Sequence, residues 1–296
     1  MEEPKIVIKP TDFVTVTKMN HITEIQYMEK MNTRQNIKKL SSEKYLVLDT
    51  GEIKEFQRNE KRIQNINSLY KTFKKLRYLI NNNYKGKPNE LFITLTFGED
   101  ENKWRPDCGD TVFLRECFKK FIRILKKNYG SIDFIRVLEP HEDGHAHHHV
   151  LLRFNDYSRI FIPSDDLESW WKMGFVKIRS LKDVDNIGAY VSAYLTDIEL
   201  NDRTALDACG DGNPTEIIEK EGKKYIKGGR VKYYPSGVQI YNKSKGIVEP
   251  ERIKMTYENA KKIVGSGKPT FEKNIVVEKD DFSNSIRFES YNSHRL

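Results

Sequence analysis

The sequence predicts an α+β protein with an antiparallel sheet that carries its helices on one face. Segments rich in β-branched and aromatic residues are typical of strands, and they alternate with segments whose apolar residues recur every three or four positions, as in amphipathic helices. From residue 91 to residue 178 the order is strand, helix, strand, strand, helix, strand. This order defines the split βαβ, or ferredoxin-like, arrangement.

Six segments make up this pattern, and a hairpin lies at its centre. Their expected ranges are 91–97 (strand), 112–128 (helix), 133–139 (strand), 146–154 (strand), 165–173 (helix) and 175–178 (strand). The two central strands are separated by HEDG at 141–144, a sequence typical of a tight turn.

The segments that flank the pattern suggest four regions. We expect a β-like N-terminal extension at 1–57, the main domain at 58–200, a loop and β-hairpin packed on the core at 201–250, and a C-terminal extension at 251–296. The expected elements outside the pattern are strands at 6–8, 13–17 and 45–48, helices at 59–82 and 182–197, a loop at 203–230, a hairpin or extended pair at 231–247, a helix at 251–264, and strands at 275–277 and 286–288.

Composition points to a polyanionic partner. The net charge of +8 and pI of about 9.1 favour nucleic acid or an anionic membrane surface. No segment approaches the roughly 20 apolar residues of a membrane span, and the N-terminus lacks a signal-peptide pattern. The three cysteines are scattered, which argues against a disulfide framework and a thiolate zinc site. We therefore expect a cytoplasmic protein without membrane contact.

Two helices each have a basic side that could contact a DNA backbone. A solvated surface explains such a charge pattern equally well. The candidate residues are Lys71, Lys74, Lys75, Arg77, Lys119 and Lys120.

Five of the seven histidines lie between residues 141 and 149, and two motifs compete for them. His141 to His145 spells HExxH, which needs a helix to bring both imidazoles to one metal ion. Pro140 and the Asp-Gly pair indicate a hairpin turn there instead.

On the following strand, His147 and His149 project to the same face because side chains alternate. Glu139 ends the preceding strand and can add a carboxylate oxygen. Such a set leaves coordination positions open and suits Mg²⁺ or Mn²⁺, with imidazole favouring Mn²⁺. The alternative is a pair of histidines hydrogen-bonded in the core. His148 should point to the opposite face.

Tyr190 and Tyr194 lie one turn apart on one face of the expected helix at 182–197. Tyrosines on an amphipathic helix commonly serve only in packing. A tyrosine hydroxyl, with a pKa of about 10, is a poor nucleophile, but a divalent ion that polarises a phosphate makes its attack feasible. The neighbouring metal set therefore favours a catalytic interpretation.

Together these motifs resemble the rolling-circle replication initiators (Rep proteins) of bacterial plasmids and phages, in the HUH endonuclease superfamily. FITLTF at 92–97 is similar to their first motif, and Glu139 with GHAHHHVLL at 144–152 to their second. The third corresponds to WKMGFVKI and DNIGAYVSAY, ending at residue 194, and YYPSGVQIYNKSKGI to a tail segment. The resemblance covers roughly residues 59–250.

The resemblance implies an HUH-type ferredoxin-like fold and a metal-dependent reaction that nicks and rejoins single-stranded origin DNA through a 5′-phosphotyrosine. Glu139, His147 and His149 would bind the metal, and Tyr190 or Tyr194 would attack. No GxxxxGK(S/T) motif occurs, so a host helicase and DNA polymerase are expected partners. Trp170 and Trp171 could stack on bases, although core packing suits tryptophan better.

Two departures keep other interpretations open. Many relatives have lysine before the second tyrosine, where this chain has Ala193, and a hydrophobic residue in place of His148. The alternatives are an HUH relaxase or transposase, or a non-catalytic DNA-binding replication-control protein on a degenerate scaffold.

Overall fold

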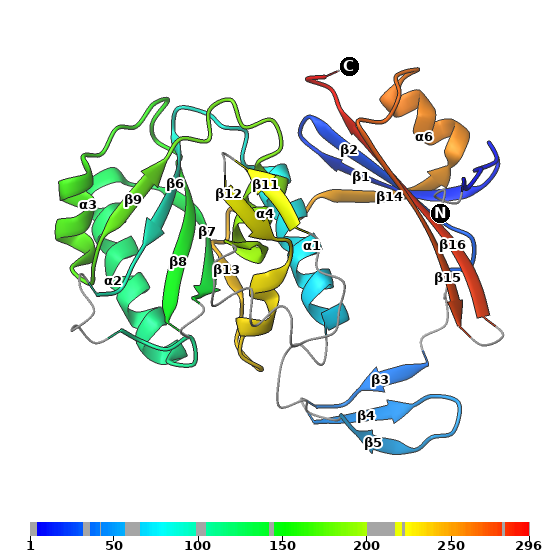
Figure 1. The fold of residues 1–296 in the computed structure, drawn as a ribbon, viewed down its shortest axis with the longest axis horizontal. Coiled ribbons are helices and arrows are strands. Elements are labelled where there is room, and N and C mark those ends of the chain that lie inside the picture. Colours follow the sequence, from blue (N-terminus) through cyan, green and yellow to red (C-terminus); the bar gives the residue numbers. More distant parts are fainter. Residues whose placement is uncertain are drawn as a thin grey trace. The chain divides into compact units, whose positions relative to one another are not determined.

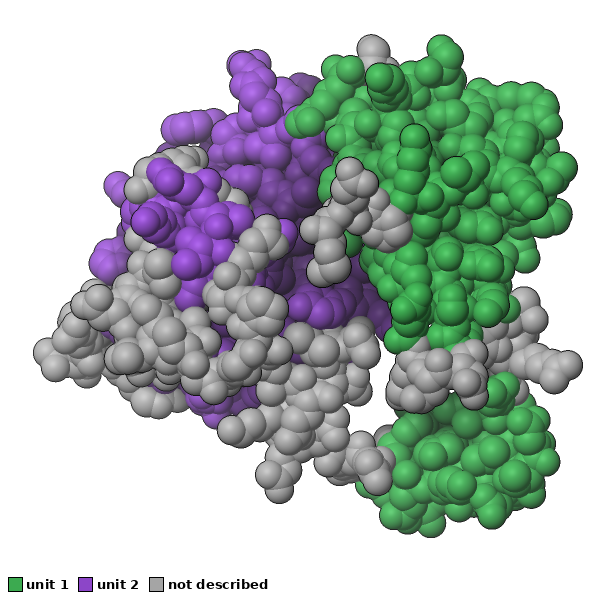
Figure 2. Space-filling model, turned by 45° about the vertical axis from the view of Figure 1, so that its right-hand side comes forward, with its two compact units in different colours: residues 1–59, 250–296 green, residues 60–249 purple. Residues whose placement is uncertain are grey.

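The computed structural model describes residues 5–31, 36–41, 43–56, 66–98, 105–141, 145–199, 217–220, 223–279 and 282–295. The chain forms two units, which are coloured separately in Figure 2. Unit 1 comprises residues 1–59 and 250–296, and unit 2 comprises residues 60–249. The two ends of the chain thus belong to one unit, although the sequence suggested two separate extensions.

A five-stranded antiparallel sheet organises unit 2 (Figure 1). Its strands, in spatial order, are β13 (Tyr241–Lys243), β7 (Ile132–Pro140), β8 (Ala146–Phe154), β6 (Glu90–Leu95) and β9 (Val176–Arg179). All four pairs are antiparallel. The α+β class and the split βαβ order are confirmed, and β7 and β8 form the predicted hairpin.

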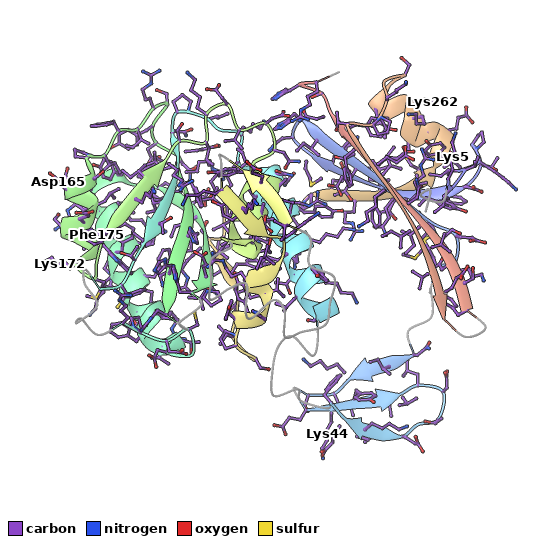
Figure 3. All side chains as sticks on the ribbon, in the orientation of Figure 1. Lys5, Lys44, Asp165, Lys172, Phe175 and Lys262 are labelled. Carbon is purple, nitrogen blue, oxygen red and sulfur yellow. The ribbon has the colours of Figure 1, made fainter. Side chains whose placement is uncertain are left out.

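The two helices within the split βαβ pattern cover one face of this sheet. They are α2 (Thr111–Tyr129) and α3 (Ser164–Trp171), and their apolar residues share a core with Ile93 and Val150. Trp171 is buried there and donates a hydrogen bond to the carbonyl of Thr96 at 2.6 Å. This tryptophan therefore packs in the core. Lys172, labelled in Figure 3, ends α3 in a left-handed conformation.

The opposite face of the sheet carries helices that lie outside the pattern. Helix α1 (Ile66–Asn83) and α4 (Ile187–Thr196) pack on a second core, to which the sheet contributes Phe92, Val137 and Leu151. Helices thus cover both faces, two from within the pattern and two that flank it. Helix α4 begins five residues later than expected, because Asn186 caps it by accepting a hydrogen bond from the Ala189 amide.

The region after α4 differs from the expected loop and hairpin. Strands β10 (Ile198–Glu199), β12 (Lys223–Ile226) and β11 (Ile217–Lys220) form a small sheet within the range predicted as a loop. The predicted hairpin at 231–247 is wrong: the 3-10 helix η2 (Gly229–Tyr233) is followed only by β13. Val231, Tyr234 and Ile240 are buried in the core beside α1 and α4 instead of pairing with one another.

Unit 1 contains a second five-stranded sheet, built from both ends of the chain. In spatial order its strands are β14 (Glu251–Thr256), β1 (Phe13–Met19), β2 (Ile22–Met28), β16 (Phe282–Asn292) and β15 (Phe271–Lys279). Helix α6 (Tyr257–Val264) packs against β1 and β14. The predicted helix at 251–264 is correct only for its second half, because residues 251–256 pair with β1.

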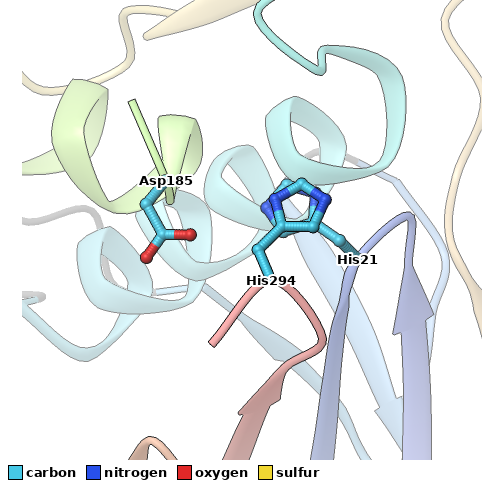
Figure 4. Close-up of side chains that lie close together, drawn as sticks. All are labelled: His21, Asp185 and His294. Atoms are coloured by element: carbon cyan, nitrogen blue, oxygen red, sulfur yellow. The ribbon is translucent and has the colours of Figure 1, made fainter. Parts of the chain in front are cut away.

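The remaining parts of unit 1 are small. Residues 6–8 form no strand, while β3 (Ile37–Lys39), β4 (Lys44–Val47) and β5 (Ile53–Glu55) make a three-stranded sheet. His21, in the turn between β1 and β2, stacks on His294 after β16, with ring centroids 4.1 Å apart (Figure 4). Among the described helices, none is both long and apolar enough to cross a membrane.

Candidate active site

The register of the β7–β8 hairpin places Glu139, His147 and His149 on one face of the sheet. Glu139 pairs with His147, and Val137 pairs with His149. Cross-strand partners project to the same face, and residues two apart on one strand do so as well. Val137 packs with α1 and α4, so the three candidate ligands lie on the face that those helices cover.

His149 is held between two side chains. Its Nε2 contacts the Glu139 carboxylate, and its Nδ1 lies 3.0 Å from the hydroxyl of Thr94 on β6. His149 and Glu139 are almost completely buried. The Thr94 contact therefore fixes the orientation of the ring, so that Nε2 is the atom directed at Glu139.

Arg230 is a residue of this site that sequence reasoning missed. Its Nη1 lies 2.8 Å from the second carboxylate oxygen of Glu139 and donates to the carbonyl of Pro140 at 3.1 Å. Its Nε donates to the carbonyl of Asp197, the residue that caps the end of α4. Arg230 therefore links the end of β7 to the end of the tyrosine helix. It lies in the segment predicted as a loop, and only its position just before the tail segment could have drawn attention to it.

Two of the candidate ligands are held in the protonation states that a metal ion needs. Burial alone would raise the pKa of Glu139, but the charges of His149, Arg230 and His147 lower this pKa to about 2. Burial, followed by the charge of His141, lowers the pKa of His147 to about 4. At neutral pH the carboxylate is ionised and the His147 imidazole is neutral, as metal binding requires.

The donor set fits a divalent ion of the Mn²⁺ type. Glu139 Oε2 and His149 Nε2 point at each other, and an ion between an imidazole and a carboxylate would replace their direct contact. His147 adds a second imidazole on the same face, with its ring 4.4 Å from that of His141. Arg230 neutralises the carboxylate in this structure.

Helix α4 brings Tyr190 to the same face of the sheet. The Tyr190 ring lies 6.4 Å from that of Phe92, which in turn lies 5.7 Å from the His149 ring. The hydroxyl of Tyr190 accepts a hydrogen bond of 3.2 Å from Arg179 on β9. Tyr194 belongs to the next turn of α4, but its side chain lies outside the described residues. The same holds for Glu142, Asp143 and Gly144 of the HExxH sequence.

A glycine allows α4 to approach α1 closely. A Cβ atom at Gly188 would lie 2.5 Å from the carbonyl oxygen of Arg77 and 2.6 Å from Asn81 Oδ1. The Gly188 amide donates to Asn81 Oδ1 at 2.7 Å, and Asn81 also donates to Asn186, the N-cap of α4. The start of the tyrosine helix is thus fixed against α1.

The basic residues predicted to contact DNA are divided between the two faces. Lys71, Lys74, Lys75 and Arg77 belong to α1, on the same face as Glu139, whereas Lys119 and Lys120 belong to α2 on the other face. Lys75 pairs with Glu249 at 3.5 Å and Lys119 with Glu116 at 2.9 Å. Only the α1 group shares a sheet face with the candidate metal ligands.

Comparison with known proteins identifies the central part of unit 2. Residues 90–199 match the family model for the replication-associated protein ORF2. No curated protein and no solved structure matches the chain significantly. The matched range runs from the first strand of the sheet through the tyrosine helix, in agreement with the resemblance to rolling-circle initiators. Residues 90–199, which contain Glu139, His147, His149, Tyr190 and Tyr194, therefore belong to the family of the replication-associated protein ORF2.

Proposed function

We propose that this protein initiates rolling-circle replication by nicking and rejoining single-stranded origin DNA through a tyrosine. One observation carries the proposal: Tyr190 on α4 shares a sheet face with Glu139 and His149, and the Phe92 ring lies between Tyr190 and His149. A nucleophile beside a carboxylate–imidazole set, in a replication-associated family, suits transfer of a DNA phosphate.

Glu139, His147 and His149 would hold a divalent ion, Mn²⁺ or Mg²⁺. When bound, such an ion supplies positive charge that polarises the scissile phosphate. Thr94 orients the His149 ring for this role through its contact with Nδ1, and Arg230 orients the carboxylate through its contact with Oε1.

The covalent step exchanges one phosphoester bond for another. The tyrosine oxygen attacks phosphorus, the bond from phosphorus to the 3′-oxygen breaks, and the tyrosine loses its proton. The 3′-oxygen gains a proton and leaves as a free 3′-OH, which a host polymerase can extend once a host helicase opens the duplex. Attack by a 3′-OH on the phosphotyrosine reverses the reaction and rejoins the strand.

Arg179 is the cation that serves Tyr190. Its guanidinium donates to the tyrosine oxygen, and so it stabilises the negative charge that develops there as the proton leaves. Relatives commonly carry lysine at the position of Ala193. A guanidinium from β9 is a structural reason why lysine is dispensable here.

A covalent-adduct assay tests the proposal. The full chain is incubated with Mn²⁺ and single-stranded oligonucleotides from the origin hairpins of its own replicon, and the products are separated on a denaturing gel. We expect an adduct that is lost in either Tyr190→Phe or Tyr194→Phe, and in Glu139→Gln. Tyr157→Phe, on an exposed loop, is the matched control and should retain it.

The alternatives predict different results in the same experiment. Tight binding to every origin strand without an adduct would identify a non-catalytic DNA-binding replication-control protein. An HUH relaxase or transposase would give the adduct but would fail to support replication of the replicon in cells. Mn²⁺ binding, followed by calorimetry on the wild type and Glu139→Gln, tests the ligands independently of the reaction.

A further inference from the structure

A cavity on the face of the sheet opposite to Glu139 has a basic lining. Its volume is about 220 Å³, and it is lined by residues from α2, β7, β8, β13 and the turn before β13. The lining residues are Thr111, Leu114, Arg115, Arg136, Leu138, His148, Gly237, Val238, Gln239 and Asn242. Two of them are arginines, and none is an aspartate or a glutamate.

Arg136 is the central charged group of this cavity and has no carboxylate partner among the described residues. Its guanidinium donates to Asn242 Oδ1 and lies 5.0 Å from the centre of the Phe118 ring. Three other arginines, Arg153, Arg230 and Arg287, each lie within 2.8 Å of a carboxylate oxygen. A partly buried guanidinium without a negative partner is costly to the fold, because a buried charge is normally paired.

The surrounding charges increase the positive potential. Arg115 is the second lining arginine, and its charge together with burial lowers the pKa of Arg136 to about 10. Glu116, beside Arg115, is shared with Lys119, whose Nζ lies 2.9 Å from it. The cavity also adjoins Thr111, the first residue of α2, where the dipole of a 19-residue helix favours an anion.

His148 provides a second, independent sign of a ligand. This residue is completely buried and lines the cavity. Its Nε2 lies 3.3 Å from the carbonyl oxygen of Leu114, to which it donates, so Nδ1 is left as an acceptor. Nδ1 is buried without a partner. Buried polar atoms are normally satisfied, and a hydroxyl of a bound molecule would satisfy this one.

We propose that this cavity binds a phosphate group, with Arg136 as the principal donor. The charged oxygens meet the guanidinium of Arg136, and a hydroxyl of the same molecule meets Nδ1 of His148. The volume is below the roughly 300–1,000 Å³ of sites for drug-sized ligands, so it suits one phosphate with part of its sugar. The phosphate belongs either to a free nucleotide or to a DNA strand, and the site does not depend on the nicking reaction.

Calorimetry with the full chain at low ionic strength tests this site, using inorganic phosphate, thymidine 5′-monophosphate and an unphosphorylated 12-residue oligonucleotide as probes. Arg136→Gln should weaken the phosphate and the mononucleotide by about tenfold or more, the loss of one charge-assisted contact. Arg123→Gln, on the exposed side of α2, removes the same charge and should bind both as the wild type does.

A second variant tests the charge argument with the opposite sign on stability. Asn242→Asp places a carboxylate against Arg136 with almost no change in shape. It should raise the melting temperature and also abolish phosphate binding, so a loss of binding in this variant cannot be ascribed to unfolding.

The probes identify the source of the phosphate. Weakening of the oligonucleotide as well as the mononucleotide by Arg136→Gln supports a DNA strand, and weakening of the mononucleotide alone supports a free nucleotide. Unchanged binding of all three probes in both Arg136→Gln and Asn242→Asp overturns the proposal. Adduct formation through Tyr190 or Tyr194 is measured separately, so the two proposals fail independently.

Discussion

The guanidinium of Arg230 lies 2.8 Å from the carboxylate of Glu139, and both side chains are buried. This contact joins a residue predicted in a mobile loop to the residue predicted to bind a metal ion. A buried carboxylate needs a counter-charge, and in this structure the counter-charge comes from the chain itself. Arg230 thus stands where a bound cation would also be attracted.

Replacement of Arg230 tests this relationship. Arg230→Gln leaves a buried carboxylate without its partner, which should cost about 3 kcal/mol of stability. Mn²⁺ restores a positive charge beside Glu139, so the rise in melting temperature on adding Mn²⁺ should be larger in the variant than in the wild type. Differential scanning fluorimetry with and without Mn²⁺ measures both effects.

Arg153→Gln is the control, because it breaks a similar pair with Asp133 and leaves the contacts of Glu139 intact. It should lower the melting temperature without changing the response to Mn²⁺. An equal response to Mn²⁺ in wild type and Arg230→Gln would show that the two cations do not share Glu139.

The hydroxyl of Thr94 should matter for metal affinity more than for stability. Thr94→Val keeps the shape but removes the contact with His149 Nδ1. Loss of such a supporting contact commonly lowers metal affinity by about 10- to 100-fold, and calorimetry with Mn²⁺ should show a drop in this range. Thr96→Val removes a hydroxyl that donates to the carbonyl of Phe175, so its Mn²⁺ affinity should equal that of the wild type. Equal affinity in Thr94→Val would contradict the assignment of His149 as a ligand.

The packing of α4 on α1 predicts a strong effect of one methyl group. Gly188→Ala places a Cβ atom 2.5 Å from the Arg77 carbonyl, so the tyrosine helix must shift. Overpacking of this kind costs about 1–3 kcal/mol, and adduct yield should fall with it. Ala189→Ser adds one atom to a half-buried position of the same helix and should change stability by much less. The hypothesis fails if Gly188→Ala melts and reacts like the wild type.

The stability of unit 1 should decrease at high pH. Burial, together with the negative charge of Glu289, raises the pKa of Tyr257 to about 12, and Tyr257 donates to Glu289 at 2.9 Å. Because the pKa is higher in the folded state than the unfolded value of about 10, this contribution is complete below pH 10 and is lost as the pH rises toward 12. Urea unfolding at about pH 9 and about pH 11.5 should show a larger loss in the wild type than in Tyr257→Phe. Tyr70→Phe, at an exposed position, should keep the wild-type loss.

Local patterns were enough to predict the centre of the fold. Strand β8 was expected at 146–154 and spans those residues, and β7 and α2 extend one residue beyond each end of their expected ranges. Alternation along β8 likewise placed His147 and His149 on one face and His148 on the other. These features depend on periodicities of two and 3.6 residues, which a short sequence window contains.

Other elements depended on partners far away in the chain. Residues 251–256 have a helical pattern but form a strand, since pairing with β1 satisfies their backbone groups. The turn before β13 has an extended pattern, yet its apolar residues are buried beside α1 and α4. In both cases tertiary contacts outweighed a weak local preference.

The sequence by itself therefore determined the split βαβ order, the shared face of Glu139, His147 and His149, and the spacing of Tyr190 and Tyr194 on one helix. Only the tertiary structure decided which helices cover that face, that both chain ends form one sheet, and that Arg230 and Arg179 are the cations beside Glu139 and Tyr190. The physical reason is the range of the interactions. Side-chain direction along a strand or helix follows from local backbone geometry, whereas an ion pair between distant residues exists only once the whole core has packed.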